Sequence, residues 1–282
     1  MIVEEHIKSL GNQLFDTARE YSVETGWIDK LVMLTTRDEN FRVQALRFID
    51  VLPSLEDDTS LTEHLQSYFG DLNLPLPELA RWGLDHSDEP WLAPIAAPLT
   101  RFTIRGLSRK FMGGQTTAEA TRTIRRLRDR GMSSSLDILG EATINEPEAE
   151  AYQQAYLKLI TNMSKEVSQW HRNDRLDHCY GREIPRLNIS LKPSSLYSQI
   201  NAVDPKGSVQ AILKRLYPII ECAREHDAFV MIDMEQYDYK HISLAVFERF
   251  LSVKTLSDWP IFVIAMQAYL RETYKDLQAL AN

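Results

Sequence analysis

Short apolar runs alternate with amphipathic segments in the second half of the chain, and this alternation predicts an α/β fold. The runs lie at residues 133–139, 186–192, 229–235 and 261–269, and residues at helical spacing follow each of them. A repeat of strand and helix in this order requires crossover connections, which favour a parallel sheet with right-handed connections. We therefore expect four β/α units in this part of the chain.

Apolar and polar residues alternate within the runs with the period of a strand, so that each run has an apolar and a polar face. The polar face of the second run ends at Lys192. In the third run Asp233 and Glu235 share one face, whereas Met234 lies on the other face with the apolar residues. A cation and two acids at the ends of polar faces predict a functional site.

Helix signals lie between the runs. Asn145 is an N-cap candidate ahead of a proline and an acid, and Asp204 precedes a proline in the same way. We expect helices from Asn145 to about residue 170, from Asp204 onward with a bend at Pro218, over 241–252, and after Tyr269.

The first part of the chain differs from the second, because its apolar residues follow helical spacing with no strand-like run to about residue 85. Prolines and turn-forming residues at 72–78 and 85–90 are the best linker candidates. We expect a helical arm or domain over residues 1–88 and a β/α domain over residues 89–282. We expect no clear exposed apolar stripe in the helical part.

Polar residues also close the first and fourth runs: Asp137 with Glu141, and Gln267 with Tyr269. The carboxyl ends of parallel strands are where β/α barrels carry their chemistry. We therefore expect Lys192 to face a barrel mouth outside the packed interior, held charged by the nearby acids. A structural alternative stays open, since strand-end acids can cap helices, a strand-end lysine can be a surface group, and Asp137 can be a turn residue.

An arginine-rich helix is expected after a capping box at Thr116 and Glu119, ending at Gly131. Its five arginines could contact phosphate, but they also suit the helix dipole, and we interpret them as a solvated structural face. The net charge of −8 argues against nucleic acid as a partner.

Composition and motifs also limit the classes of protein to which this chain can belong. Two cysteines favour a reducing compartment, and nothing in the spacing of the histidines suggests a metal site. There is neither a long apolar run nor a secretory leader pattern in the sequence, nor a glycine-rich dinucleotide loop. A flavin or nucleotide would therefore be held in the barrel mouth.

Four ordered segments, at residues 135–142, 188–194, 232–236 and 265–270, resemble the first half of the proline dehydrogenase barrel. Residues 42–53 resemble the helices before the barrel in the bacterial bifunctional proline utilisation enzymes. The resemblance implies a (β/α)8 TIM-type barrel of which this chain holds the first four units.

The resemblance also implies an activity: FAD-dependent oxidation of L-proline to Δ1-pyrroline-5-carboxylate, with a hydride passing to flavin N5 and electrons passing to a membrane quinone. The implied location is cytoplasmic, and peripheral binding at the inner face of the membrane stays open. The protein's part in such a reaction is orientation and electrostatics.

Residue roles follow from the same resemblance. Lys192 is expected beside the flavin and the substrate carboxylate, and Gln267 is expected to hydrogen-bond the flavin. Glu141 and Asp233 are expected to orient site arginines. The remaining expected contacts are Asp233 and Met234 with the cofactor, and Asp137, Glu235 and Tyr269 as support for the substrate site.

The chain departs from the family pattern because the later strands and the paired arginines that grip the proline carboxylate are not in it. We therefore expect a fragment of a longer enzyme, inactive alone, with an aldehyde dehydrogenase domain as the expected downstream continuation. Two open parallel edges would remain on such a half barrel.

Two other function classes stay open. A barrel lyase or aldolase could use Lys192 to form a Schiff base with a carbonyl substrate. The third hypothesis is that the chain is a non-catalytic helical interaction module with an attached half barrel.

Overall fold

The computed structural model describes residues 2–21, 38–55, 57–72, 78–86, 89, 91–140, 142–252 and 262–281. Contacts divide the chain into two compact units, Met1–Met112 and Gly113–Asn282. This grouping places helix α6 (Ala93–Phe111) in the first unit. The predicted domain boundary at residue 88 stays a prediction, and most of the two predicted linkers lies outside the described residues.

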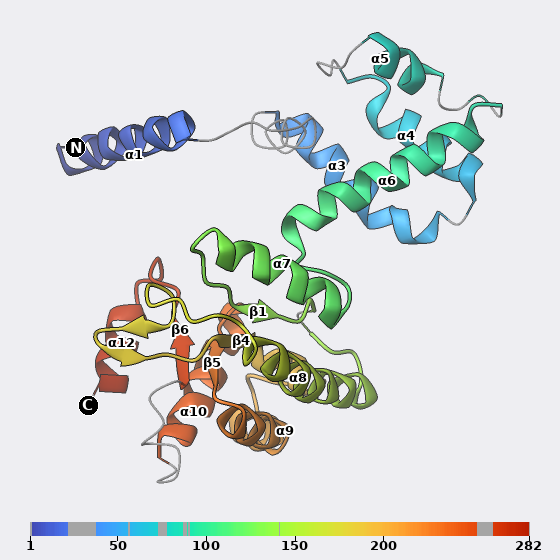
Figure 1. Ribbon diagram of the computed structural model, residues 1–282. Helices are drawn as coiled ribbons and strands as arrows, with labels where there is room; N and C mark the ends of the chain where they lie inside the picture. Colours follow the sequence, from blue (N-terminus) through green and yellow to red (C-terminus); the bar gives the residue numbers. More distant parts are fainter. Residues whose placement is uncertain are drawn as a thin grey trace. The chain divides into compact units, whose positions relative to one another are not determined.

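The first unit is helical throughout its described residues, as its spacing predicts (Figure 1). Its elements are α1 (Ile2–Tyr21), α3 (Glu39–Val51), the 3-10 helix η1 (Leu52–Ser54), α4 (Asp58–Phe69), α5 (Glu78–Asp85) and α6. Asp38 and Asp57 cap α3 and α4 by accepting hydrogen bonds from backbone N–H groups. A small core forms around Phe48 and Phe69, whose ring centroids are 5.4 Å apart.

Exposed apolar side chains follow one face of α1, which corrects the expectation of no such stripe. Ile7, Leu10 and Leu14 are 64%, 51% and 63% exposed, at helical spacing. Helix α6 carries a similar exposed series that includes Ile95 and Leu99. No described helix has the length and apolar character needed to cross a membrane.

The second unit contains the predicted β/α repeat. Its helices are α7 (Thr117–Asp129), α8 (Glu146–Val167), η2 (Pro193–Leu196), α9 (Pro205–Glu225), η3 (Tyr237–Tyr239), α10 (Lys240–Leu251) and α12 (Thr273–Ala281). Its strands are β1 (Leu136–Asp137), β2 (His178–Cys179), β3 (Arg182–Glu183), β4 (Leu187–Leu191), β5 (Ala228–Asp233) and β6 (Phe262–Ala265). The predicted caps at Asn145 and Asp204 are confirmed, and α9 continues through Pro218.

Four parallel strands form the main sheet in the order β1-β4-β5-β6. Helices α8, α9 and α10 cover one of its faces (Figure 1), and their apolar residues join those of β4 and β5 in one core. Val230 and Ile232 are fully buried in that core. The predicted fold class, a helical region followed by a parallel β/α region, is confirmed.

The opposite face of the sheet is partly exposed. In β5 every second residue from Phe229 to Asp233 is half-buried, while the residues between them are buried. This is the alternation that the sequence predicts, with the polar strand-end residues on the less covered face. Strand β6 is shorter than predicted, so the alternation stops before Tyr269, which lies in a turn and is 79% exposed.

Candidate active site

Register in the parallel sheet brings the predicted polar residues to one edge. Asp137 of β1 pairs with Ser190 of β4, two residues before Lys192. Asp233 at the end of β5 pairs with Ala265 at the end of β6. The carboxyl ends of all four strands therefore lie at the same end of the sheet, where the sequence predicts a site.

Lys192 lies between two of the predicted acids. Its Nζ donates a hydrogen bond to Asp137 Oδ2 and lies 3.4 Å from Glu235 Oε1. The Lys192 side chain is 7% exposed, whereas those of Asp137 and Glu235 are 35% and 32% exposed. The expectation that Lys192 lies outside the packed interior is wrong, because the end of β4 leads straight into the buried turn η2.

The charge of Lys192 is set by opposing effects. Burial alone would lower the pKa of its ammonium group, but the hydrogen bond and charge of Asp137, followed by those of Glu235, raise that pKa above its ordinary value. Lys192 therefore stays protonated at neutral pH. A buried cation that stays charged can bind an anionic group of a substrate.

Tyr156 of α8 is a member of this cluster that the sequence did not single out. Its hydroxyl donates to Asp137 Oδ1 over 3.4 Å, and its side chain is fully buried. Burial, then the charge of Asp137, raises the pKa of Tyr156, so the hydroxyl keeps its proton. The only signal in the sequence was the residue type: tyrosine places a polar hydroxyl on the face of the helix that packs on the sheet.

Gln267 is held in place just after β6. Its side-chain amide donates to the main-chain oxygen of Glu235 over 2.9 Å, and its own main-chain oxygen accepts a 2.6 Å hydrogen bond from Thr273. The structure therefore joins Gln267 to the loop that carries Glu235, as their shared place at the sheet edge predicts.

The other predicted site residues take different positions. Asp233 is half-buried, and its carboxylate makes no hydrogen bond or ion pair within the described part of the chain. Met234 is 4% exposed and follows the helix-covered alternation, so its predicted cofactor contact stays a prediction. Glu141 lies outside the residues that the structure describes.

The loop after β1 depends on a glycine that the pattern of strand ends did not single out. Gly140 has a φ of 139°, and a Cβ atom there would lie 1.5 Å from the hydroxyl of Tyr152. The same hydroxyl donates to the main-chain oxygen of Leu139 over 3.0 Å. Only glycine fits this close approach, which fixes the chain that follows Asp137.

A second ion-pair cluster lies at the opposite end of the strands. Arg128 makes two hydrogen bonds to the carboxylate of Asp177, of 2.8 and 2.7 Å, and Arg186 approaches the same carboxylate at 3.1 Å. Arg128 also lies over the ring of Trp170, 5.7 Å from its centroid. The interpretation of the arginine helix as a solvated face is wrong for Arg128, whose side chain is 12% exposed.

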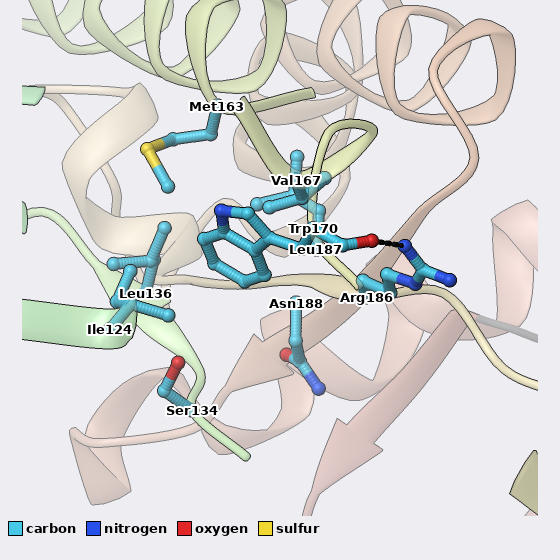
Figure 2. Close-up of a pocket in the computed structure, with 9 residues that line it drawn as sticks. All are labelled: Ile124, Ser134, Leu136, Met163, Val167, Trp170, Arg186, Leu187 and Asn188. Atoms are coloured by element: carbon cyan, nitrogen blue, oxygen red, sulfur yellow. Dashed lines mark hydrogen bonds between the residues drawn. The ribbon is translucent and has the colours of Figure 1, made fainter. Parts of the chain in front are cut away.

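A small pocket lined by both apolar and polar side chains adjoins this second cluster. Figure 2 shows Trp170 in it beside Met163 and Val167, with the hydrogen bond that Arg186 donates to the main-chain oxygen of Trp170. Asn188, near the start of β4, also lines the pocket, which places it away from Lys192 at the end of that strand. The candidate active site is therefore the Lys192 cluster and not this pocket.

Comparison with known families gives a match for each of the two parts of the chain. A family model described as proline dehydrogenase matches residues 120–282, more than half of the chain. The chain belongs to the proline dehydrogenase family. A second model, described as the proline utilization A N-terminal domain, matches residues 4–111 of this family member.

Relatives of this proline dehydrogenase family member include longer proteins. The bifunctional protein PutA of Klebsiella aerogenes is 27% identical over 231 residues, which cover 82% of the chain and 15% of the relative. Proline dehydrogenase 1 of Bacillus subtilis subsp. natto is 24% identical over 175 residues, 62% of the chain and 48% of the relative. The chain thus spans less than half the length of each of these relatives.

A solved structure supports the same assignment. Proline utilization A of Bdellovibrio bacteriovorus, inactivated by N-propargylglycine, matches 99% of the chain with a TM-score of 0.80 and 27% identity. The match covers 27% of that protein. The four parallel β/α units are accordingly part of a proline dehydrogenase barrel.

Proposed function

We propose that this chain contributes to the FAD-dependent oxidation of L-proline to Δ1-pyrroline-5-carboxylate. The observation that carries the proposal is the buried, protonated Lys192 held between Asp137 and Glu235 at the strand ends of a proline dehydrogenase barrel. A fixed cation in a partly desolvated site attracts a carboxylate more strongly than one in water. Lys192 would orient the carboxylate of L-proline.

The residues at this edge fit a flavin. Among the described residues, the amide oxygen of Gln267 and the carboxylate of Asp233 have no hydrogen-bond donor, so both can accept hydrogen bonds from a bound group. Gln267 would bind FAD. Asp233 and Glu141 would orient arginine side chains around the site. Bound FAD would supply the acceptor for the hydride that leaves the substrate.

The chain's own contribution is orientation and charge. Asp137 and Glu235 hold Lys192 protonated, and Tyr156 fixes Asp137 by a hydrogen bond. We assign Tyr269 a supporting role at the rim, consistent with its exposure. We further propose a membrane quinone as the final electron acceptor, a cytoplasmic location, and an aldehyde dehydrogenase domain elsewhere in the same protein.

The alternative of a lysine Schiff base is less well supported. Attack on a carbonyl requires a neutral amine, which enzymes obtain by lowering the lysine pKa. The pKa of Lys192 is raised instead, because two carboxylates face it. These contacts favour the charged form of Lys192, which its proposed role as partner of the substrate carboxylate requires.

The first prediction tests the activity in the complete gene product that contains these 282 residues. After purification with FAD it is expected to be yellow, and L-proline should bleach its flavin absorbance under anaerobic conditions. D-proline is the matched control. N-propargylglycine, which inactivated the Bdellovibrio protein, is the probe for the site and should abolish the bleaching. A colourless protein that does not take up FAD, or covalent trapping of a carbonyl substrate on Lys192 by borohydride, would contradict the proposal.

The second prediction concerns Gln267. Gln267→Ala removes a hydrogen bond worth roughly 0.5–1.5 kcal/mol, so FAD affinity should fall about 2- to 12-fold or the flavin reduction potential should shift. Fluorescence titration with FAD and anaerobic redox titration measure the two effects. Gln278→Ala on the exposed part of α12 is the control and should change neither. An unaltered flavin in Gln267→Ala would remove this residue from the cofactor site.

A further inference from the structure

A buried ion pair joins the first residue of α10 to α12, outside the set of residues assigned above. Lys240 Nζ donates to Asp276 Oδ2 over 2.8 Å, and the two side chains are only 3% and 16% exposed. Lys240 follows the loop after β5, and Asp276 follows the loop after β6. The pair therefore links the chain segments that leave two neighbouring strands.

A second contact joins the same two segments. The hydroxyl of Tyr237 donates to Glu272 Oε1 over 3.0 Å, and Lys240 Nζ lies 5.9 Å from the centroid of the Tyr237 ring. The side-chain hydrogen bond from Gln267 to the main-chain oxygen of Glu235 is a third link between these loops. Glu235 contacts Lys192, and Gln267 lies at the proposed flavin site. The two loops that carry these residues are thus also joined by contacts farther from the site.

The physical character of the pair favours a positioning role. Taking two charges out of water costs free energy that their attraction only partly offsets, so a buried ion pair is a poor source of stability. Its hydrogen-bond geometry is directional, and buried polar pairs are best attested where they select one arrangement over others. Asp276 raises the pKa of Lys240, so the ammonium group remains charged at neutral pH.

We propose that the Lys240–Asp276 ion pair, supported by the Tyr237–Glu272 hydrogen bond, is a clamp that positions Gln267 and Glu235 for flavin and proline. This inference rests on the proposed function for its effect on catalysis. The clamp residues do not touch the reacting groups, so they act as positioning residues through the two loops.

The test is the double variant Lys240→Met/Asp276→Leu in the complete gene product, loaded with FAD. It removes both charges at once and leaves apolar side chains of similar length, so no buried charge is left without a partner. We expect a melting temperature close to that of the wild type, a shifted flavin potential and visible spectrum, and a KM for L-proline raised roughly 2- to 10-fold. Asp276→Asn, which preserves shape, is the second variant if the double variant does not fold.

A matched pair at the other end of the strands gives the control. Arg128→Met/Asp177→Leu removes a buried ion pair far along β4 from Lys192 and also takes the carboxylate partner of Arg186, so it disturbs the fold at least as much, yet it should leave the flavin potential and KM unchanged. Equal effects of the two double variants on the flavin would overturn the clamp, since they would indicate general loosening of the fold.

Hydrogen exchange separates the clamp from the proposed activity. Removal of the clamp should speed amide exchange in residues 234–240 and 266–273 relative to the control variant. Unchanged exchange in both loops would overturn the clamp even in an active enzyme. A wild-type protein that neither binds FAD nor oxidises proline would instead contradict the proposed function, and faster exchange in the clamp variant would still support the mechanical link.

Discussion

Lys192→Met is expected to lower kcat/KM for L-proline by roughly 10²- to 10³-fold, the usual effect of removing one preorganised charge from an active site. Methionine keeps the length and apolar stem of lysine but cannot pair with a carboxylate. Steady-state assays with an artificial dye as electron acceptor measure the effect.

The same variant should also lose stability. Without Lys192, the carboxylates of Asp137 and Glu235 lose the cation that lies between them. Both are about one-third exposed, so water screens part of the repulsion, and we expect a loss of about 1–3 kcal/mol. Lys214→Met, on the exposed side of α9, is the control and should change neither property. Proline kinetics equal to those of the wild type would remove Lys192 from the site.

Asp177→Asn is expected to lower the free energy of unfolding by about 3 kcal/mol, the largest stability effect we predict. The Asp177 side chain is 6% exposed and accepts two hydrogen bonds from Arg128, one from the Asn173 backbone N–H and an ion pair with Arg186. An amide leaves these cations without a counter-charge. Urea unfolding measures the change. Asp174→Asn is the matched control, because Asp174 is 80% exposed and its ion pair with Arg172 should contribute less than about 1 kcal/mol.

The same carboxyl group predicts a pH dependence of stability. Hydrogen bonds from Arg128, opposed by burial and aided by the Asn173 N–H, lower the pKa of Asp177 from 3.8 to about 2 in the folded protein. A lowered folded-state pKa stabilises the protein fully above the unfolded value, and this stabilisation is lost as pH falls from about 4 to 2. Asp177→Asn should lack this part of the acid dependence. Parallel acid profiles for the two proteins would contradict the assignment.

Local patterns predicted most of the second unit. Strands β4 and β5 were recognisable because their buried face is apolar at every second position, and α8 and α9 because Asn145 and Asp204 offer side-chain oxygens to unpaired N–H groups. Strand β1 was harder to delimit, since only Leu136 and Asp137 pair with β4 and serines precede them. The extent of pairing depends on the partner strand, which a local pattern does not contain.

The candidate site was likewise predicted in part from local sequence, while the rest depends on tertiary packing. Parallel strands in alternation with helices bring their carboxyl ends together, so the sequence alone predicted that Asp137, Lys192, Glu235 and Gln267 would meet. It did not predict that Lys192 is buried, because that depends on how the turn η2 packs against α8 and α9.

The sequence by itself determined the order of strands and helices, the polar strand ends and the resemblance that places the chain in its family. Spacing and residue type within short segments specify those features. Only the tertiary structure decided which charges pair across distance. Arg128 with Asp177 and Lys240 with Asp276 come from separate elements, as do Tyr156 and Asp137, whose contact is a hydrogen bond. The partner sets the direction of the pKa shift in Asp177 and Lys240, whereas burial sets it in Tyr156, and both partner and burial exist only once the helices pack on the sheet.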